Sequence, residues 1–258
     1  MSFAVLYDST RCVGCRLCER ACAQKWGLPY NDAVAAEEKL SERKLTAVVT
    51  RGEVYGRRMC MHCLDPACVS VCPVAALKKT LSGPVVYDES RCMGCRYCML
   101  ACPFGVPVYE WSRLLPRIKK CNLCEERLRD GRPTACSEAC PTGATVTGKR
   151  EELVEEARRR IAASPGDYWP GIYGLREAGG TSVLMLAAVP PAQLGLPARL
   201  PHEPLPALTW RALSLVPDVV GIGSVLLGSI YWITHRREEV AAAEGPRAAK
   251  PVKKGERS

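Results

Sequence analysis

Residues 12–22, CVGCRLCERAC, and residues 92–102, CMGCRYCMLAC, share one spacing of four cysteines, C-x2-C-x2-C-x3-C. The stretches before them also match in register, VLYDSTR at 5–11 with VVYDESR at 85–91. Two further quartets resemble each other through C-x3-C-P-x-x-A, which ends one quartet at Cys72 and the other at Cys140. The chain therefore contains two related units, each with two cysteine quartets.

All 16 cysteines fall into these quartets. The quartets are Cys12, Cys15, Cys18 and Cys22; Cys60, Cys63, Cys68 and Cys72; Cys92, Cys95, Cys98 and Cys102; and Cys121, Cys124, Cys136 and Cys140. The spacing of the first and third is the bacterial ferredoxin motif for [4Fe-4S] clusters, in which the fourth cysteine binds the other cluster of a pair. Three of the four final cysteines precede proline, as that motif predicts. We therefore predict that the chain carries electrons through four [4Fe-4S] clusters.

Zinc and disulfides are the alternative uses of so many cysteines. Disulfide frameworks belong mostly to short secreted domains, whereas this chain has 258 residues. Structural zinc also uses C-x2-C pairs but rarely continues as x2-C-x3-C-P. The formal charge of +9 would fall to about +1 if sixteen thiolates held four 2+ cores. The basic residues then balance cluster charge, and no nucleic-acid partner is expected.

The second and third quartets are adjacent in sequence, which suggests that one unit is inserted in the other. We predict an α+β fold of two interleaved bacterial ferredoxin-like 2[4Fe-4S] units with insertions, plus a single C-terminal transmembrane helix. The four-cluster ferredoxin-like domain covers 1–148. Its inner unit is 60–102, and its outer unit combines 1–22 with 121–148.

Local patterns predict the smaller elements. Strands at 3–7 and 85–87 lead into the first and third quartets, whose fourth cysteine is expected to open a helix. Alternation over 45–58 predicts a hairpin. A charge gradient from acidic to basic favours a helix at 151–163. Within 149–207, the other expected elements are a surface strap at 164–180, a buried strand at 181–189 and a proline-rich linker at 190–206.

Residues 213–233, LSLVPDVVGIGSVLLGSIYWI, contain one charged residue, Asp218. As a helix, the stretch from Trp210 to Trp232 spans about 33 Å, close to the hydrocarbon core of roughly 30 Å. We predict a transmembrane anchor at 208–235 and a basic, disordered tail at 236–258. A buried helix of a soluble protein is the alternative.

Lys and Arg are more frequent after the anchor than before it. Seven follow the apolar stretch 213–233, whereas Arg199 and Arg211 are the two in the twenty residues before it. This asymmetry predicts a single-pass protein of the cell membrane with a cytoplasmic tail and the cluster domain on the periplasmic face. Met1 leads almost directly into the first strand without a signal peptide, so export is expected to require a signal-bearing partner.

Several longer stretches carry a family resemblance. They are LYDSTRCVGC at 6–15, CMHCLDPACVSVCPVAALKK at 60–79, CRYCMLACPFGVP at 95–107, CPTGA at 140–144 and GGTSVL at 179–184. In them the chain resembles the HybA-type four-cluster iron–sulfur subunit of membrane-bound, quinone-linked [NiFe] hydrogenases. The β subunit of membrane-bound formate dehydrogenase is similar over the same stretches. HybA-type subunits usually carry a twin-arginine signal, and this feature is missing from the sequence.

The resemblance implies how the cysteines share the clusters. Site 1 combines Cys12, Cys15, Cys18 and Cys140; site 2 combines Cys121, Cys124, Cys136 and Cys22; site 3 combines Cys60, Cys63, Cys68 and Cys102; and site 4 combines Cys92, Cys95, Cys98 and Cys72. The family also implies that site 1 faces the catalytic partner and that site 4 is membrane-proximal. Because Cys95 is present, a [4Fe-4S] rather than a [3Fe-4S] centre is expected at site 4.

The family implies an electron relay that is not catalytic alone. The implied partners are the hydrogenase small and large subunits, an integral membrane quinone-reducing subunit, and membrane lipid. A molybdopterin catalytic subunit replaces the hydrogenase in the formate dehydrogenase alternative. His62 is interpreted as lying beside a cluster or at the surface, not as a ligand. A soluble polyferredoxin carrier and a zinc scaffold are the distant alternatives.

Overall fold

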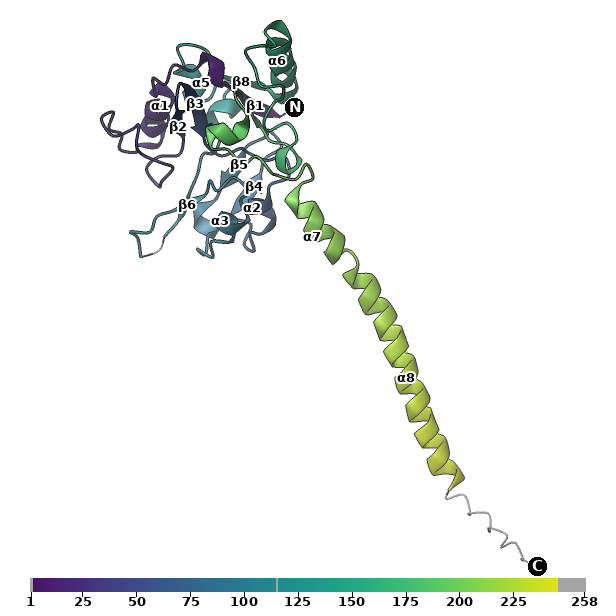
Figure 1. Cartoon of the computed structure of the whole chain (residues 1–258). Helices are drawn as coiled ribbons and strands as arrows, with labels where there is room; N and C mark the ends of the chain where they lie inside the picture. The colour runs from purple at the N-terminus through teal and green to yellow at the C-terminus, as the bar shows by residue number, and fades with distance from the viewer. Residues whose placement is uncertain (1, 115, 246–258) are drawn as a thin grey trace, which may run out of the picture. The chain divides into compact units, whose positions relative to one another are not determined.

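Strand β1 (Phe3–Asp8), which leads into the first quartet, is the centre of the largest sheet. β8 (Thr145–Lys149) pairs with β1 antiparallel, and β9 (Val183–Leu186) pairs with it parallel. Helix α6 (Arg150–Ala163) packs on this sheet through its apolar face and confirms the predicted helix (Figure 1). The sheet therefore joins the N-terminal strand to residues that follow the last quartet.

The other strands form three antiparallel pairs. They are β2 (Ala47–Arg51) with β3 (Val54–Arg58), β4 (Leu77–Lys79) with β5 (Val85–Tyr87), and β6 (Val108–Tyr109) with β7 (Ile118–Lys119). Gly52, with φ 59°, lies in the two-residue turn between β2 and β3, where left-handed backbone favours glycine. The predicted hairpin and both predicted short strands are confirmed.

Short helices and 3-10 turns connect these strands. They are α1 (Leu17–Trp26), α2 (Ala67–Ser70), α3 (Tyr97–Ala101), α4 (Glu125–Arg129), α5 (Ala135–Glu138), η1 (Ser9–Arg11), η2 (Glu89–Arg91), η3 (Glu177–Gly179) and η4 (Pro191–Leu194). α1 packs against α5, and α2 packs against α3. The computed structural model describes residues 2–114 and 116–245, and over these the chain has the predicted α+β class.

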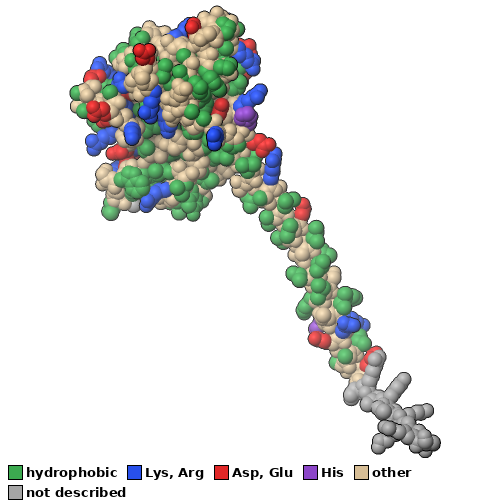
Figure 2. All heavy atoms as spheres, in the orientation of Figure 1, with side chains coloured by type: hydrophobic (Ala, Val, Ile, Leu, Met, Phe, Trp, Pro, Cys, Tyr) green, Lys and Arg blue, Asp and Glu red, His purple; other side chains and the backbone are tan. Residues whose placement is uncertain are grey.

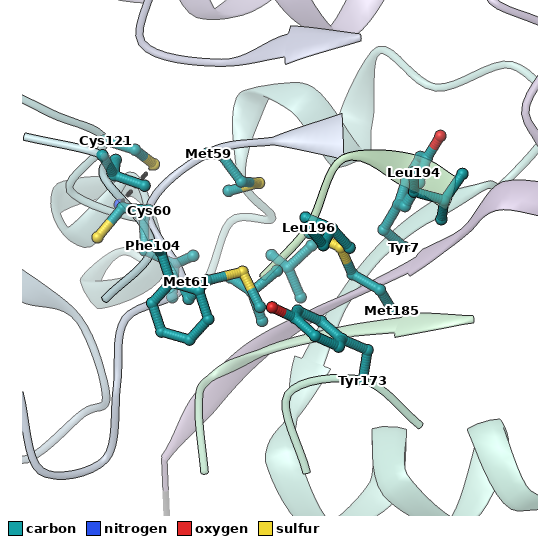
Figure 3. Packing of buried hydrophobic residues seen from close by; sticks show 14 of the residues in the cluster. Tyr7, Met59, Cys60, Met61, Phe104, Cys121, Tyr173, Met185, Leu194 and Leu196 are labelled. Atoms are coloured by element: carbon teal, nitrogen blue, oxygen red, sulfur yellow. Dashed lines mark hydrogen bonds between the residues drawn. The ribbon is translucent and has the colours of Figure 1, made fainter. Parts of the chain in front are cut away.

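The largest apolar core combines residues from before and after the last quartet. In Figure 3, Met59 and Met61 lie among the side chains of Tyr173 and Met185. Phe104 meets Tyr173 edge-on, with ring centroids 6.5 Å apart. The sulfurs of two cysteines, which belong to different quartets, lie at one end of this core (Figure 3).

The predicted domain boundary at residue 148 is not a structural boundary. Residues up to Leu208 form one compact unit. Proline and glycine predict a surface strap at 164–180 and a proline-rich linker at 190–206, but Tyr173 and Leu194 from these segments are buried in the core. Both predictions therefore need correction, because a few apolar side chains anchor otherwise irregular backbone.

Residues from Thr209 onward form a second unit. It contains most of α7 (Leu205–Leu213) and all of α8 (Val216–Glu244), and the stretch 205–244 is long and apolar enough to cross a membrane. Figure 2 shows hydrophobic side chains along most of α8. The hydroxyls of Ser229 and Thr234 donate to carbonyls one turn earlier, which satisfies these groups within the helix.

The C-terminal tail differs in part from its prediction. Disorder was expected from residue 236 because the composition is polar, but α8 continues to Glu244. The prediction is therefore wrong for 236–244, where Arg236 and His235 both pair with Glu239 one turn away. Residues 246–258 lie outside the described residues.

Candidate functional site

The first and third quartets begin in the same local turn. The carboxylate of Asp8 accepts a hydrogen bond from Thr10 N at 3.1 Å, and that of Asp88 accepts one from Ser90 N at 3.0 Å. Each aspartate thereby caps a 3-10 turn that ends at the first cysteine of its quartet. The sequence repeat is therefore also a repeat of backbone geometry.

A glycine directly precedes the second cysteine in both quartets. Gly14 and Gly94 have φ values of 69° and 76°, which favour glycine. A Cβ atom on Gly14 would collide with the ring of Tyr55, and one on Gly94 would collide with the hydroxyl of Tyr109. The Tyr109 hydroxyl also donates to the Gly94 carbonyl at 2.6 Å. A tyrosine from another strand thus supports each loop.

The helix after each loop begins earlier than predicted. α1 begins at Leu17, after Arg16 in left-handed conformation, so that both Cys18 and Cys22 lie on it. In the third quartet, Cys98 lies on α3 and Cys102 caps its C-terminus. The prediction that the fourth cysteine opens the helix is therefore wrong. The third and fourth cysteines stand four residues apart, about 6 Å along a helix axis.

None of the sixteen cysteines is paired in a disulfide. Most are buried or half-buried, and Cys15 and Cys95 are exposed. Among residues 2–114 and 116–245, no three His, Cys, Asp or Glu side chains converge on a single-ion position, as tetrahedral zinc requires. In a cubane each thiolate binds a different iron, so its four ligands stand further apart.

The four cysteines of site 2 line one cavity. Its walls are Trp26, Thr46, Arg57, Met59, Leu123, Thr134 and Ala135. Burial, together with the nearby thiols of Cys136 and Cys124, raises the pKa of Cys22 to about 12. Burial also raises the pKa of Cys121 well above its ordinary value. Four soft sulfur donors around an apolar cavity fit an iron–sulfur cluster, whose positive iron would favour their thiolate forms.

Cysteines of site 3 come together from two quartets. Burial is the main cause that raises the pKa of Cys68 to about 12, and the thiols of Cys60 and Cys102 add to it. Burial and the same two thiols also raise the pKa of Cys63. The last cysteine of the third quartet therefore lies with three cysteines of the second quartet.

At site 4, the last cysteine of the second quartet lies with three cysteines of the third quartet. Burial raises the pKa of Cys98 to about 11, with further contributions from Cys92, Cys95 and Cys72. Cys72 is the last cysteine of the second quartet and therefore lies with the third. Among the cysteines of this site, Cys95 is exposed, so site 4 reaches the protein surface.

At site 1, the structure supports the grouping of Cys12 with Cys18 but not that of Cys140. Burial raises the pKa of Cys18 to about 11, and Cys12 is among the thiols that contribute. Burial opposes ionisation of Cys140, but backbone hydrogen bonds from Thr145 and Thr142 outweigh it and lower its pKa. The grouping of Cys140 with the first quartet still rests on the family resemblance.

His62 is buried, which removes the surface interpretation. Its Nδ1 accepts a hydrogen bond from Val85 N at 2.9 Å, so the proton of the neutral ring lies on Nε2. Burial, with Lys120 and Lys79 nearby, holds the pKa of His62 well below its ordinary value. The imidazole is therefore a neutral group close to site 3.

The sequence patterns did not indicate that Arg57 and Lys79 lie beside the sites. Arg57 is fully buried beside site 2, and Lys79 is half-buried near site 3. In an alternating strand, Arg57 occupies an inward position, and this is the one sequence signal that could have identified it. Charged residues are rarely buried alone, so sequence reasoning assigns both to the surface.

Known proteins share this cysteine framework. Residues 51–150 match the family described as a 4Fe-4S dicluster domain. The hydrogenase-2 operon protein HybA of Escherichia coli is 39% identical over 240 residues, which cover 76% of this chain and 73% of that protein. The chain belongs to the HybA-type family of iron–sulfur subunits.

Two further relatives extend this comparison. A protein of Nitratidesulfovibrio vulgaris is 41% identical over 96% of this chain and 71% of its own length. The iron–sulfur subunit of the nitrate-inducible formate dehydrogenase of Escherichia coli is 32% identical over 75% of this chain and 72% of that subunit. The predicted HybA-type resemblance is thus confirmed, and formate dehydrogenase iron–sulfur subunits are relatives.

Proposed function

We propose that this chain is an electron-transfer subunit that relays electrons through four [4Fe-4S] clusters. The observation that carries the proposal is a series of electrostatic contacts between cysteines of neighbouring sites. Cys18 of site 1 interacts with Cys136 of site 2; Cys121 of site 2 interacts with Cys60 of site 3; and Cys68 of site 3 interacts with Cys98 of site 4. These interactions support a linear order of the sites from 1 to 4. When bound, each cluster supplies a centre that accepts and donates one electron.

Strand pairing supports two interleaved ferredoxin-like units. In the inner unit, β4 pairs with β5 and α2 packs against α3. In the outer unit, the sequence-equivalent elements repeat this arrangement, because β8 pairs with β1 and α5 packs against α1. Each unit takes its strands and helices from the segments that carry its own cysteines.

Both ends of the proposed relay reach the surface. Cys15 is exposed at site 1 and Cys95 at site 4, whereas the cysteines of site 2 are all buried. Electrons would enter at site 1 from the small and large subunits of a periplasmic [NiFe] hydrogenase. They would leave from site 4 to an integral membrane subunit that reduces quinone. The membrane-spanning length of 205–244 supports an anchor beside that acceptor.

A formate-oxidising partner is the second candidate. The 32% identity to a formate dehydrogenase iron–sulfur subunit supports it, since such a subunit would use the same relay with a molybdopterin catalytic subunit. Purification of the native complex separates the two. A partner with nickel and hydrogen-dependent dye reduction supports the hydrogenase, whereas molybdenum or tungsten with formate-dependent reduction supports the alternative. A chain that purifies alone without detergent would contradict both.

Metal content tests the number of clusters. We expect about sixteen iron and sixteen sulfide per chain, beyond those of the partners, because four complete quartets are present. Iron, sulfide and zinc are measured on the detergent-purified complex. A fully loaded sample with about twelve iron, or with zinc in a quartet, would contradict the proposal.

Cys95→Ser tests the order of the relay. The variant should lose quinone reduction but retain most of the reduction of an artificial dye by the catalytic partner, because the dye accepts electrons upstream of site 4. Cys15→Ser, at the opposite end, is the matched variant. Equal loss of both activities in Cys95→Ser would show that the order is wrong.

A further inference from the structure

Arg57 is a fully buried cation that lines the cavity of site 2. Its Nε donates to the hydroxyl of Thr46 at 3.1 Å, and its Nη1 donates to the hydroxyl of Thr145 at 2.7 Å. Its Nη2 is buried without a hydrogen-bond partner among the described residues. Two hydroxyls thus fix the guanidinium and leave one nitrogen free for another acceptor.

The groups that favour the charge of Arg57 are sulfur atoms of two sites. Burial opposes its charge, but the thiols of Cys136 and Cys18 outweigh burial and raise its pKa. Cys136 belongs to site 2 and Cys18 to site 1. The ring of Tyr7 adds a weaker contact, with its centroid 6.0 Å from the guanidinium carbon. The cation therefore lies between the first two proposed clusters.

We infer that Arg57 is a positioning residue whose fixed charge raises the reduction potential of the cluster at site 2, and to a smaller extent that of site 1. This inference rests on the proposed cluster assignment. Reduction adds one electron to a cluster, and a nearby cation stabilises that added negative charge. The effect is strong because the site is buried, and low dielectric lengthens the reach of a charge. Hydrogen bonds to cluster sulfur act in the same direction.

The consequence is a favourable first step along the relay. Arg57 lines the cavity of site 2, and Cys136 of that site favours its charge more than Cys18 of site 1 does. The cluster at site 2 is therefore stabilised in its reduced state more than the cluster at site 1. Electrons that enter at site 1 would pass inward, and the reverse step would be less populated.

The test compares Arg57→Gln, Arg57→Lys and the control Arg58→Gln in the purified complex. Arg58 is the next residue of β3, but its side chain donates to the carbonyls of Gly195 and Phe104 away from the cavity of site 2. The control therefore removes the same charge from the same strand. Reduction potentials are measured by redox titration monitored by electron paramagnetic resonance, with iron and sulfide measured on each sample.

At a fixed ambient potential, Arg57→Gln should reduce the ratio of reduced to oxidised cluster at site 2 by about tenfold. Arg57→Lys should recover part of this loss, because the charge returns without the planar fork that binds Thr46 and Thr145 together. Arg58→Gln should leave the potential unchanged. A loaded Arg57→Gln complex with unchanged potentials would overturn the inference. If both Arg57 variants lost iron only from site 2, Arg57 would have a purely structural role. That result would also overturn the inference. Total iron that never approaches sixteen, even in the unsubstituted complex, would instead contradict the proposed function.

Discussion

The pKa of Lys79 is subject to two opposing effects, burial and the nearby cysteine thiols. Its ammonium donates hydrogen bonds to the carbonyls of His62 and Gly83 and to the hydroxyl of Ser182. Burial lowers its pKa to about 8, while the thiols of Cys63 and Cys60 act in the opposite direction. Lys79 therefore titrates near neutral pH beside site 3, far below an exposed lysine.

This titration predicts a pH-dependent potential at site 3. Reduction makes the cluster more negative and raises the pKa of Lys79 above about 8. At pH values between the pKa of Lys79 beside the oxidised cluster and its pKa beside the reduced cluster, reduction of the cluster is accompanied by protonation of Lys79. The potential should therefore be constant below pH 8 and should fall above it, by up to about 59 mV per pH unit. Redox titrations from acid to alkaline pH measure this slope, and Lys79→Met should abolish it. The same slope in Lys79→Met would assign the proton to another group.

Gly94→Ala should destabilise the loop of the third quartet for two reasons, the positive φ at this position and a steric clash. The substitution forces alanine into left-handed backbone and drives its Cβ into the Tyr109 hydroxyl. We expect a loss of about 2–4 kcal/mol in stability and incomplete iron loading at site 4. Gly105→Ala is the control, because Gly105 has a φ of 60° but open space around it. Its cost should be about 1 kcal/mol. Equal melting temperatures for the two variants would contradict the role of the Tyr109 contact.

At the scale of elements, the sequence predicted correctly those helices and strands whose signals lie within the element itself. The hairpin of β2 and β3 and helix α6 were predicted correctly because turn residues, alternation and end charges all lie within each element. The start of α1 was missed because it depends on Arg16 adopting left-handed backbone, which no sequence pattern signals. The buried roles of Tyr173 and Leu194 depend on partners far away in sequence.

A substitution in strand β9 tests whether the cluster domain extends beyond residue 148. All four of its side chains are buried, and Leu184 packs with α6 on one face of the sheet. Leu184→Ala should lower stability by about 2–5 kcal/mol, because it leaves a cavity in a packed core. The temperature at which the cluster absorbance disappears reports the loss. Leu81→Ala, at a fully exposed leucine, should change it little. A tolerant Leu184→Ala would mean that the domain does end near residue 148.

At the scale of the molecule, spacing found all sixteen candidate ligands but not their surroundings. Cysteine spacing is a local property, and the family resemblance supplied a pairing that the contacts of Cys22, Cys72 and Cys102 support. The buried cations could not be predicted in the same way. Arg57 reaches Thr145 only after the hairpin of β2 and β3 and the central sheet have come together.

Membrane topology can be tested through the tail. Seven Lys and Arg follow Ile233, whereas Arg199 and Arg211 are the two in the twenty residues before the apolar span, so the end of the chain should face the cytoplasm. A reporter protein that is active only in the cytoplasm should therefore work when fused after Ser258. A reporter that is active only in the periplasm should not. Activity of the periplasmic reporter would reverse the proposed orientation and place the clusters on the cytoplasmic face.

The position of β1 between β8 and β9 also bears on how the protein is made. The first strand to leave the ribosome cannot complete its sheet until residues 183–186 have followed it. The inner unit, by contrast, has both of its paired strands and all eight of its cysteines within 60–102. At about 5–20 residues per second, translation makes the inner unit available several seconds earlier. The proposed sites 3 and 4 therefore have all their ligands once residue 102 is made, whereas the proposed sites 1 and 2 wait for residue 140, and their sheet for residue 186.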